Sequence, residues 1–96
     1  MFESIIEPIK RQLTAAGVVR LGVFGSFSRQ EATPDSDVDV LVIFKPEQRT
    51  FDNLYLVGEV LEQVFCRRVD LVTEDSLSRH IGPKILKEVK YVDLGL

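Results

Sequence analysis

The stretch 22–44 constrains the fold of this chain more than any other segment, because two apolar runs flank a glycine, a turn and a pair of acids. The first run ends at Gly25-Ser26, and the second begins with Asp37 and Asp39. Side chains two residues apart on a strand share a face, so we expect both carboxylates to lie side by side. Neighbouring carboxylates repel each other unless a cation lies between them. The stretch therefore predicts two strands with a cation-attracting acidic pair at the start of the second.

Gly25 and Ser26 stand where the first predicted strand ends and a short helix is expected over 27–31. Glycine allows close approach of a ligand to the backbone, and the N–H groups that begin a helix bind anions. The Ser26 hydroxyl can cap the same helix, and this structural role is compatible with phosphate binding. The pair is therefore predicted to hold phosphate groups.

The rest of the pattern alternates between helical and strand periodicity, which is typical of an α/β fold. The sequence predicts these elements in order: a first helix capped by Ser4 and Glu7 and ended by Gly17, a strand over 18–24, the short helix over 27–31, a turn over 33–36, a strand over 37–44, a helix from Asp52 to Phe65, a strand over 69–72, a C-terminal helix that begins near Pro83, and an edge strand or packed tail at 91–92. We expect a single domain over 1–96, built as a small mixed sheet with helices packed mainly on one face.

Strand parity indicates which face of the sheet the helices cover. Asp37, Asp39, Leu41 and Ile43 share one face of the second predicted strand. We expect the three longer helices to cover the opposite face, which leaves little chain for the acid-bearing face. That face is therefore predicted to stay partly open or to be covered by another subunit, in a hetero-oligomer or a homo-oligomer.

Charge and composition exclude several classes of protein. The net charge of −3 argues against strong nucleic-acid binding, because proteins that bind the phosphate backbone by charge carry a basic excess. The basic pair Arg67-Arg68 is expected to be solvated. No apolar run approaches the length of a membrane span, and the single cysteine, Cys66, excludes an internal disulfide. These features predict a cytoplasmic protein that makes no contact with a membrane.

A third acid, Asp70, interrupts the predicted strand over 69–72. Phosphoryl or nucleotidyl transfer needs a metal between carboxylates, donors that grip the phosphates, an in-line nucleophile, and a group that accepts or orients the proton of that nucleophile. Asp37 and Asp39 supply oxygen ligands of the kind that Mg²⁺ prefers. Asp70 can complete a second metal site and accept the proton of an attacking hydroxyl. The structural alternative for Asp70 is an acid that simply faces water at a strand start.

Gly25-Ser26, ten intervening residues and Asp37-Val38-Asp39 resemble the signature of the polymerase-beta-like nucleotidyltransferase superfamily. The context is similar as well, since the Gly-Ser pair closes one predicted strand and the Asp pair opens the next. The intervening residues and the segment 67–72 resemble the minimal nucleotidyltransferase (MNT) subgroup in particular. The resemblance extends over about 18–92. Gln30 departs from it, because close relatives more often have glycine at that position.

The resemblance implies a polymerase-beta-like nucleotidyltransferase fold and the antitoxin half of a two-gene HEPN/MNT module. Such antitoxins use ATP and Mg²⁺, with two ions expected, to place AMP on a tyrosine of the HEPN ribonuclease toxin and so silence it. Carried over by position, the implied site comprises Gly25, Ser26 and Arg29 as ligands of the triphosphate, and Asp37, Asp39 and Asp70 as metal ligands and catalytic acids. For Arg29 an ordinary surface position is the alternative.

Two other functions remain open from the sequence. The chain can neutralise its partner by occlusion alone, as a binding antitoxin without catalysis. It can also transfer nucleotides to RNA or to a small hydroxylated molecule, although the acidic balance and the absence of a second domain disfavour this. Three converging acids favour catalysis, because occlusion does not require them.

Overall fold

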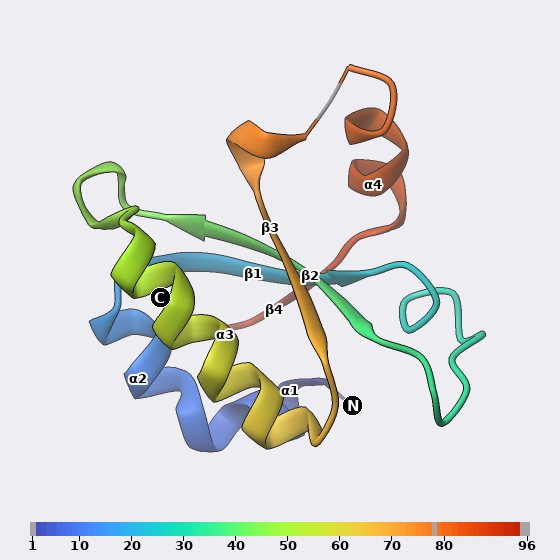
Figure 1. The fold of residues 1–96 in the computed structure, drawn as a ribbon, viewed down its shortest axis with the longest axis horizontal. Coiled ribbons are helices and arrows are strands. Elements are labelled where there is room, and N and C mark those ends of the chain that lie inside the picture. Colours follow the sequence, from blue (N-terminus) through green and yellow to red (C-terminus); the bar gives the residue numbers. More distant parts are fainter. Residues whose placement is uncertain (1, 78, 95–96) are drawn as a thin grey trace.

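The computed structural model describes residues 2–77 and 79–94, which fold around a four-stranded mixed sheet of order β3-β2-β1-β4 (Figure 1). The strands are β1 (Val18–Phe24), β2 (Val38–Phe44), β3 (Val69–Thr73) and β4 (Lys90–Val92). β1 is antiparallel to both β2 and β4, whereas β2 and β3 are parallel. The predicted α/β class and mixed sheet are confirmed, and 91–92 lies in an edge strand.

The first helical segment is interrupted at Pro8. It consists of α1 (Phe2–Ile6), the 3-10 turn η1 (Glu7–Ile9) and α2 (Lys10–Ala15). Because the α-helix already begins at Phe2, the predicted capping box at Ser4 is wrong. Proline has no N–H to continue an α-helical ladder, which explains the change to 3-10 geometry at this point. The end of the helix was predicted correctly, since Gly17 takes the left-handed φ of +93°.

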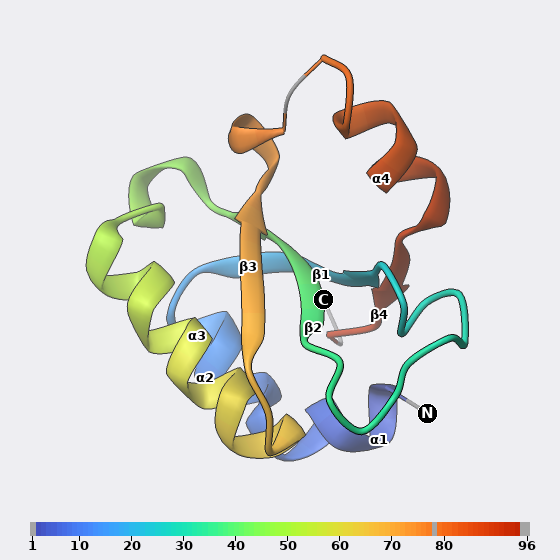
Figure 2. The ribbon, with the colours of Figure 1, turned by 45° about the vertical axis from the view of Figure 1, so that its right-hand side comes forward.

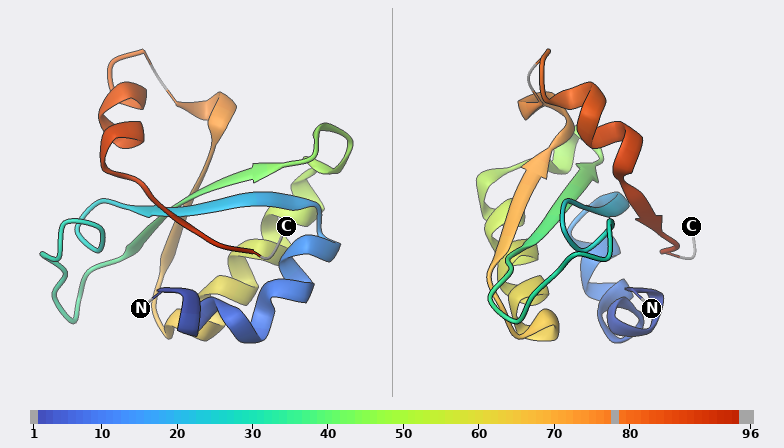
Figure 3. Two further views of the ribbon diagram at one scale, coloured as in Figure 1. Left: turned by 180° about the vertical axis from the view of Figure 1, so that it is seen from behind. Right: turned by 90° about the vertical axis from the view of Figure 1, so that its right-hand side faces the viewer.

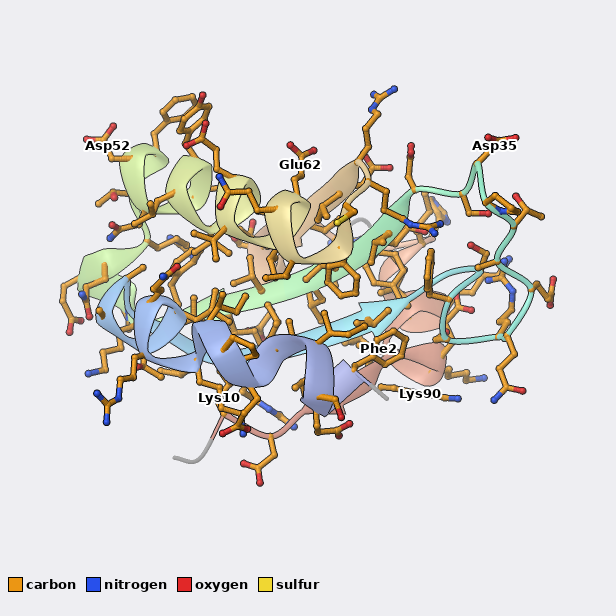
Figure 4. The ribbon with its side chains drawn as sticks, turned by 90° about the horizontal axis from the view of Figure 1, so that it is seen from below. Phe2, Lys10, Asp35, Asp52, Glu62 and Lys90 are labelled. Atoms are coloured by element: carbon orange, nitrogen blue, oxygen red, sulfur yellow. The ribbon has the colours of Figure 1, made fainter. Side chains whose placement is uncertain are left out.

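Helices α1, α2 and α3 (Phe51–Phe65) lie side by side against one face of the sheet, as the view from below shows (Figure 4). Thr50 caps α3 by accepting a hydrogen bond from the N–H of Asn53 at 3.2 Å. The main core contains the inward side chains of these helices and of the central strands, among them Ile6, Leu13, Val38, Val40, Val57 and Leu61, each at most 1% exposed. None of the described helices has the length and apolar character needed to cross a bilayer.

Helix α4 (Gly82–Glu88) covers the opposite face of the sheet, and Figures 1 and 3 show it on the other side from α1 to α3. Ile85 of α4 packs on Phe24 and Leu41, and Leu41 is fully buried. The prediction that all longer helices share one face is therefore wrong. α4 follows the 3-10 turn η3 (Glu74–Ser76) after β3, and this connection brings it over the acid-bearing face.

Replacement of Ile85 by alanine tests the docking of α4 on the sheet. We expect Ile85→Ala to lower the free energy of unfolding by about 2–3 kcal/mol, because it leaves a cavity beside Leu41. Leu86 is the matched control, since it is the next residue of the same helix and is 50% exposed. Leu86→Ala should change stability by no more than about 0.5 kcal/mol in urea denaturation. Equal effects of the two variants would contradict this packing.

Candidate active site

The strand register brings the predicted acids to one edge of the sheet. Asp39 of β2 pairs with Asp70 of β3, and on its other side it pairs with Phe24, the last residue of β1. Asp37 immediately precedes β2, one residue outside the strand in which it was expected. Because β1 runs antiparallel to β2, the turn that begins at Gly25 lies at the same edge.

Gly25 is in direct contact with the carboxylate of Asp39. A Cβ atom on Gly25 would collide with Oδ2 of Asp39 and would lie 3.1 Å from its Cγ. Gly25 also has a φ of +70°, a conformation that disfavours residues with a side chain. The glycine is therefore required here by both backbone conformation and the close approach of the acid.

The segment after Gly25 forms consecutive turns over 25–30, so the predicted short helix over 27–31 is wrong. The N–H of Arg29 donates to the carbonyl of Gly25 at 3.1 Å, but the N–H of Glu31 reaches the carbonyl of Ser26 at 2.8 Å. Gln30 between them has a left-handed φ of 59°, which ends helical propagation. This is the position where the resembled subgroup more often has glycine. Ser26 therefore lies in a tight turn and caps no helix.

Ser28 is a polar residue of this turn that sequence reasoning missed. It is only 5% exposed, and its hydroxyl donates to the carbonyl of Gly25 at 3.1 Å. This bond closes the turn from within and holds the Gly25 peptide in position. A serine two residues after the signature gave no signal of this role, because its burial depends on the tertiary packing around it.

The electrostatic surroundings of Asp39 disfavour its negative charge. Partial burial is the main cause that raises the pKa of the Asp39 carboxyl, and the charges of Asp70 and then Asp37 raise it further. Arg29 opposes these effects, and Glu88 adds a smaller upward contribution. A bound cation would relieve the crowding of negative charge at this edge of the sheet.

Arg29 joins the turn over 25–30 to helix α4. Its Nη1 lies 2.7 Å from a carboxylate oxygen of Glu88, and its Nε lies 3.4 Å from Glu31. Glu88 is a neighbour that the sequence did not reveal, because it lies 59 residues away from Arg29 in the chain. The predicted contact of Arg29 with phosphate stays a prediction, and the arginine has a defined protein partner at the rim of the site.

The acids fit a hard divalent cation by donor type and by number. Within 2–77 and 79–94, no group of three or more acidic, histidine or cysteine side chains is arranged to hold a metal by itself. Mg²⁺ does not need one, because it is usually bound by one or two carboxylates together with phosphate oxygens of the substrate. Asp37 and Asp39 supply such a pair, and Asp70 is exposed next to Asp39.

Comparison with known proteins identifies the family. The sequence model of a protein family, described as the nucleotidyltransferase domain, matches residues 3–92. The chain is 45% identical over 93 residues to the protein adenylyltransferase MntA of Thermococcus cleftensis, and the match covers 94% of this chain and 91% of that protein. The chain belongs to the nucleotidyltransferase domain family.

Two solved structures share this nucleotidyltransferase fold. A toxin–antitoxin structure with AMP-PNP matches with a TM-score of 0.71 and 24% identity, over 95% of this chain and 72% of the other. A complex of the tri-AMPylated HEPN toxin of Shewanella oneidensis with its MNT antitoxin matches with a TM-score of 0.60 and 21% identity, over 95% and 71% of the chains. At these identities the likeness establishes the fold, and the predicted nucleotidyltransferase fold is confirmed.

Gly25→Ala tests the contact between the turn and the acid. We expect a loss of at least about 1–2 kcal/mol in the free energy of unfolding, because alanine is strained at this φ and displaces the Asp39 carboxylate. Gly58 of α3 is the control, since a Cβ there would meet only the flexible side chain of Leu71, at 3.3 Å. Gly58→Ala should stay within about 0.5 kcal/mol, because its gain in helix propensity offsets the tight contact. A Gly25→Ala variant as stable as the wild type would contradict this geometry.

Asp39→Asn tests the electrostatic crowding through the pH dependence of stability. A carboxyl whose pKa is raised by folding binds its proton more tightly in the folded state, so stability falls as pH rises from the usual aspartate range through the raised pKa. Asp39→Asn removes this loss of stability, because asparagine does not ionise. In the absence of divalent cations we expect its Tm at pH 7 to exceed that of the wild type. The difference should vanish near pH 3, where both side chains are neutral, and a lower Tm at pH 7 would contradict the assignment.

Proposed function

We propose that this chain is a magnesium-dependent protein adenylyltransferase that transfers AMP from ATP to a hydroxyl of a HEPN ribonuclease toxin, and so acts as its antitoxin. The observation that carries the proposal is the pairing of Asp39 with Asp70 in the β2–β3 register, next to the Gly25 turn. Such a cluster of carboxylates serves metal-assisted transfer and has no use in mere occlusion.

In the proposed reaction the residues divide the work between phosphate binding and proton transfer. The turn at Gly25 and Ser26 receives the triphosphate, and Arg29 at its rim can move from Glu88 to a phosphate oxygen. Mg²⁺, held by Asp37 and Asp39, would neutralise the charge of the triphosphate when bound. The hydroxyl oxygen of the acceptor forms a bond to the α-phosphorus, the bond from that phosphorus to the bridging oxygen breaks, and pyrophosphate leaves. Asp70 takes the proton of the hydroxyl.

The nature of the acceptor is supported by the relatives. The Thermococcus relative is named a protein adenylyltransferase, and the Shewanella structure contains an AMPylated HEPN toxin with its antitoxin. A hydroxyl of the HEPN partner is therefore the proposed acceptor, with a tyrosine implied by the resemblance to the MNT subgroup, and the proposed complex is a hetero-oligomer. ATP and a ribonuclease target both belong to the cytoplasm, which is where we propose that the protein acts.

The reaction is tested with purified chain, its HEPN partner, Mg²⁺ and ATP labelled at the α-phosphate. Label should appear on the partner protein, and chelation of Mg²⁺ should abolish it. Asp37→Asn and Asp39→Asn should each reduce the transfer at least about 100-fold, since each removes a group that stabilises developing charge. Asp35→Asn is the matched control, because Asp35 projects from the tip of the loop that precedes Asp37, away from the sheet (Figure 4).

Two outcomes would contradict the proposal in different ways. Undiminished neutralisation of the toxin by the double variant Asp37→Asn/Asp39→Asn would establish occlusion in place of catalysis. Label recovered in RNA or in a small hydroxylated molecule, and absent from the protein partner, would establish a nucleotidyltransferase with another acceptor.

A further inference from the structure

The backbone on either side of Asp37 is held by the two residues that precede β3. The carbonyl of Ser36 accepts a hydrogen bond from Nη1 of Arg67 at 3.0 Å. The N–H of Val38 donates to the carbonyl of Arg68 at 2.9 Å. Both peptide groups that flank Asp37 are thus fixed, although Asp37 itself lies before the first residue of β2.

The side chain of Arg67 also closes the turn that leads to Asp37. The same Nη1 donates to the carbonyl of Thr33 at 3.1 Å. Within this turn the N–H of Ser36 donates to the carbonyl of Thr33 at 3.0 Å, and the N–H of Thr33 donates to Oγ of Ser36 at 2.9 Å. The residues at 33–35 are exposed, so apolar packing does not hold them in place. Among the described residues, the hydrogen bonds that join this turn to another segment both come from the Arg67 guanidinium.

Arg67 connects this turn to the phosphate-binding turn as well. Its guanidinium carbon lies 4.9 Å from the ring centroid of Phe27, which belongs to the turns over 25–30. Phe27 in turn contacts Phe2 of α1, at 6.5 Å between ring centroids. A planar guanidinium can donate hydrogen bonds in its plane while it stacks on an aromatic face, whereas a lysine ammonium has no plane that could stack. The turns over 25–30 and 33–36 lie together at one side of the sheet (Figure 2).

We propose that Arg67 is a positioning residue, which holds Asp37 in place for metal binding by clasping the turn over 33–36 against Phe27. The inference rests on the proposed function, because Asp37 is a metal ligand only in that reaction. The expectation of a solvated Arg67-Arg68 pair is wrong for Arg67, which is half-buried, and correct for Arg68, which is exposed. Only the side chain of Arg67 can act in this way, since Arg68 contributes its backbone carbonyl.

The first test measures amide hydrogen exchange by NMR in the chain alone. Arg67→Met keeps most of the stem and removes the donors, and Arg68→Met is the control at the next position. We expect the Ser36 amide to exchange at least about tenfold faster in Arg67→Met, because two hydrogen bonds to a charged donor and a stacking contact are lost. Arg68→Met should leave this rate unchanged. Equal rates in Arg67→Met and the wild type would overturn the proposal.

The second test measures binding of Mn²⁺, as a substitute for Mg²⁺, in the presence of a non-hydrolysable ATP analogue. We expect the Kd for Mn²⁺ to rise about tenfold in Arg67→Met, which is the lower end of the range for groups that support a metal ligand. Arg67→Lys should recover part of this loss, because an ammonium can also donate to both carbonyls. A purely structural role would lower Tm, but the Kd for Mn²⁺ would not increase in the order wild type, Arg67→Lys, Arg67→Met. An unchanged Kd in Arg67→Met would overturn the proposal.

The two tests separate this inference from the proposed function. The exchange experiment needs neither nucleotide nor partner, so it decides whether Arg67 orders the turn before Asp37. A wild-type chain that transfers no AMP overturns the proposed function and leaves the exchange result standing. A wild-type chain that transfers AMP while Arg67→Met shows normal exchange and normal Mn²⁺ binding overturns only the role of Arg67.

Discussion

The contact between the Gly25 backbone and the Asp39 carboxylate is the constraint on which the rest of the site depends. It brings the proposed phosphate-binding turn and a proposed metal ligand together with no side chain between them. The same closeness leaves Asp39 partly desolvated and next to Asp70, so its pKa is raised. Folding alone disfavours this concentration of negative charge, and a bound cation would relieve it.

The scaffold maintains this arrangement by covering the sheet unevenly. α1, α2 and α3 pack on the central strands at one face, whereas α4 packs on the other face around Phe24 and Leu41. The acid-bearing edge beyond Leu41 stays partly exposed, since Asp37 and Asp39 are half-buried and Asp70 is exposed. α4 also carries Glu88, whose ion pair with Arg29 connects the covered half of this face to the rim of the site.

Irregular segments carry much of the site, and their order comes from specific polar contacts. The turn after Gly25 is closed by the buried hydroxyl of Ser28, and the turn before Asp37 is closed by Arg67. The strands determine which acids are neighbours, because strand register sets the pairing of residues on adjacent strands. The hydrogen bonds of these turns then determine where the Gly25 peptide and the Asp37 backbone lie.

Local patterns in the sequence determined the elements and the identity of the acids. The bounds of β1, the end of α3 at Phe65 and the end of the first helix at Gly17 were all predictable, because each depends on periodicity or on the conformational preference of one residue. Two predictions of local structure were wrong: Pro8 interrupts the first helix, and Gln30 prevents a helix after Ser26.

Only the tertiary structure decided which residues meet. The pairing of Asp39 with Asp70, the position of α4 on the acid-bearing face, and the partners of Arg29 and Arg67 all join segments far apart in the chain. No periodic pattern in the sequence predicts such contacts, because they arise from strand register and from the path of the connections between elements. The sequence alone therefore determined which acids and which turn this nucleotidyltransferase domain has, and the fold decided how closely they lie and what holds them there.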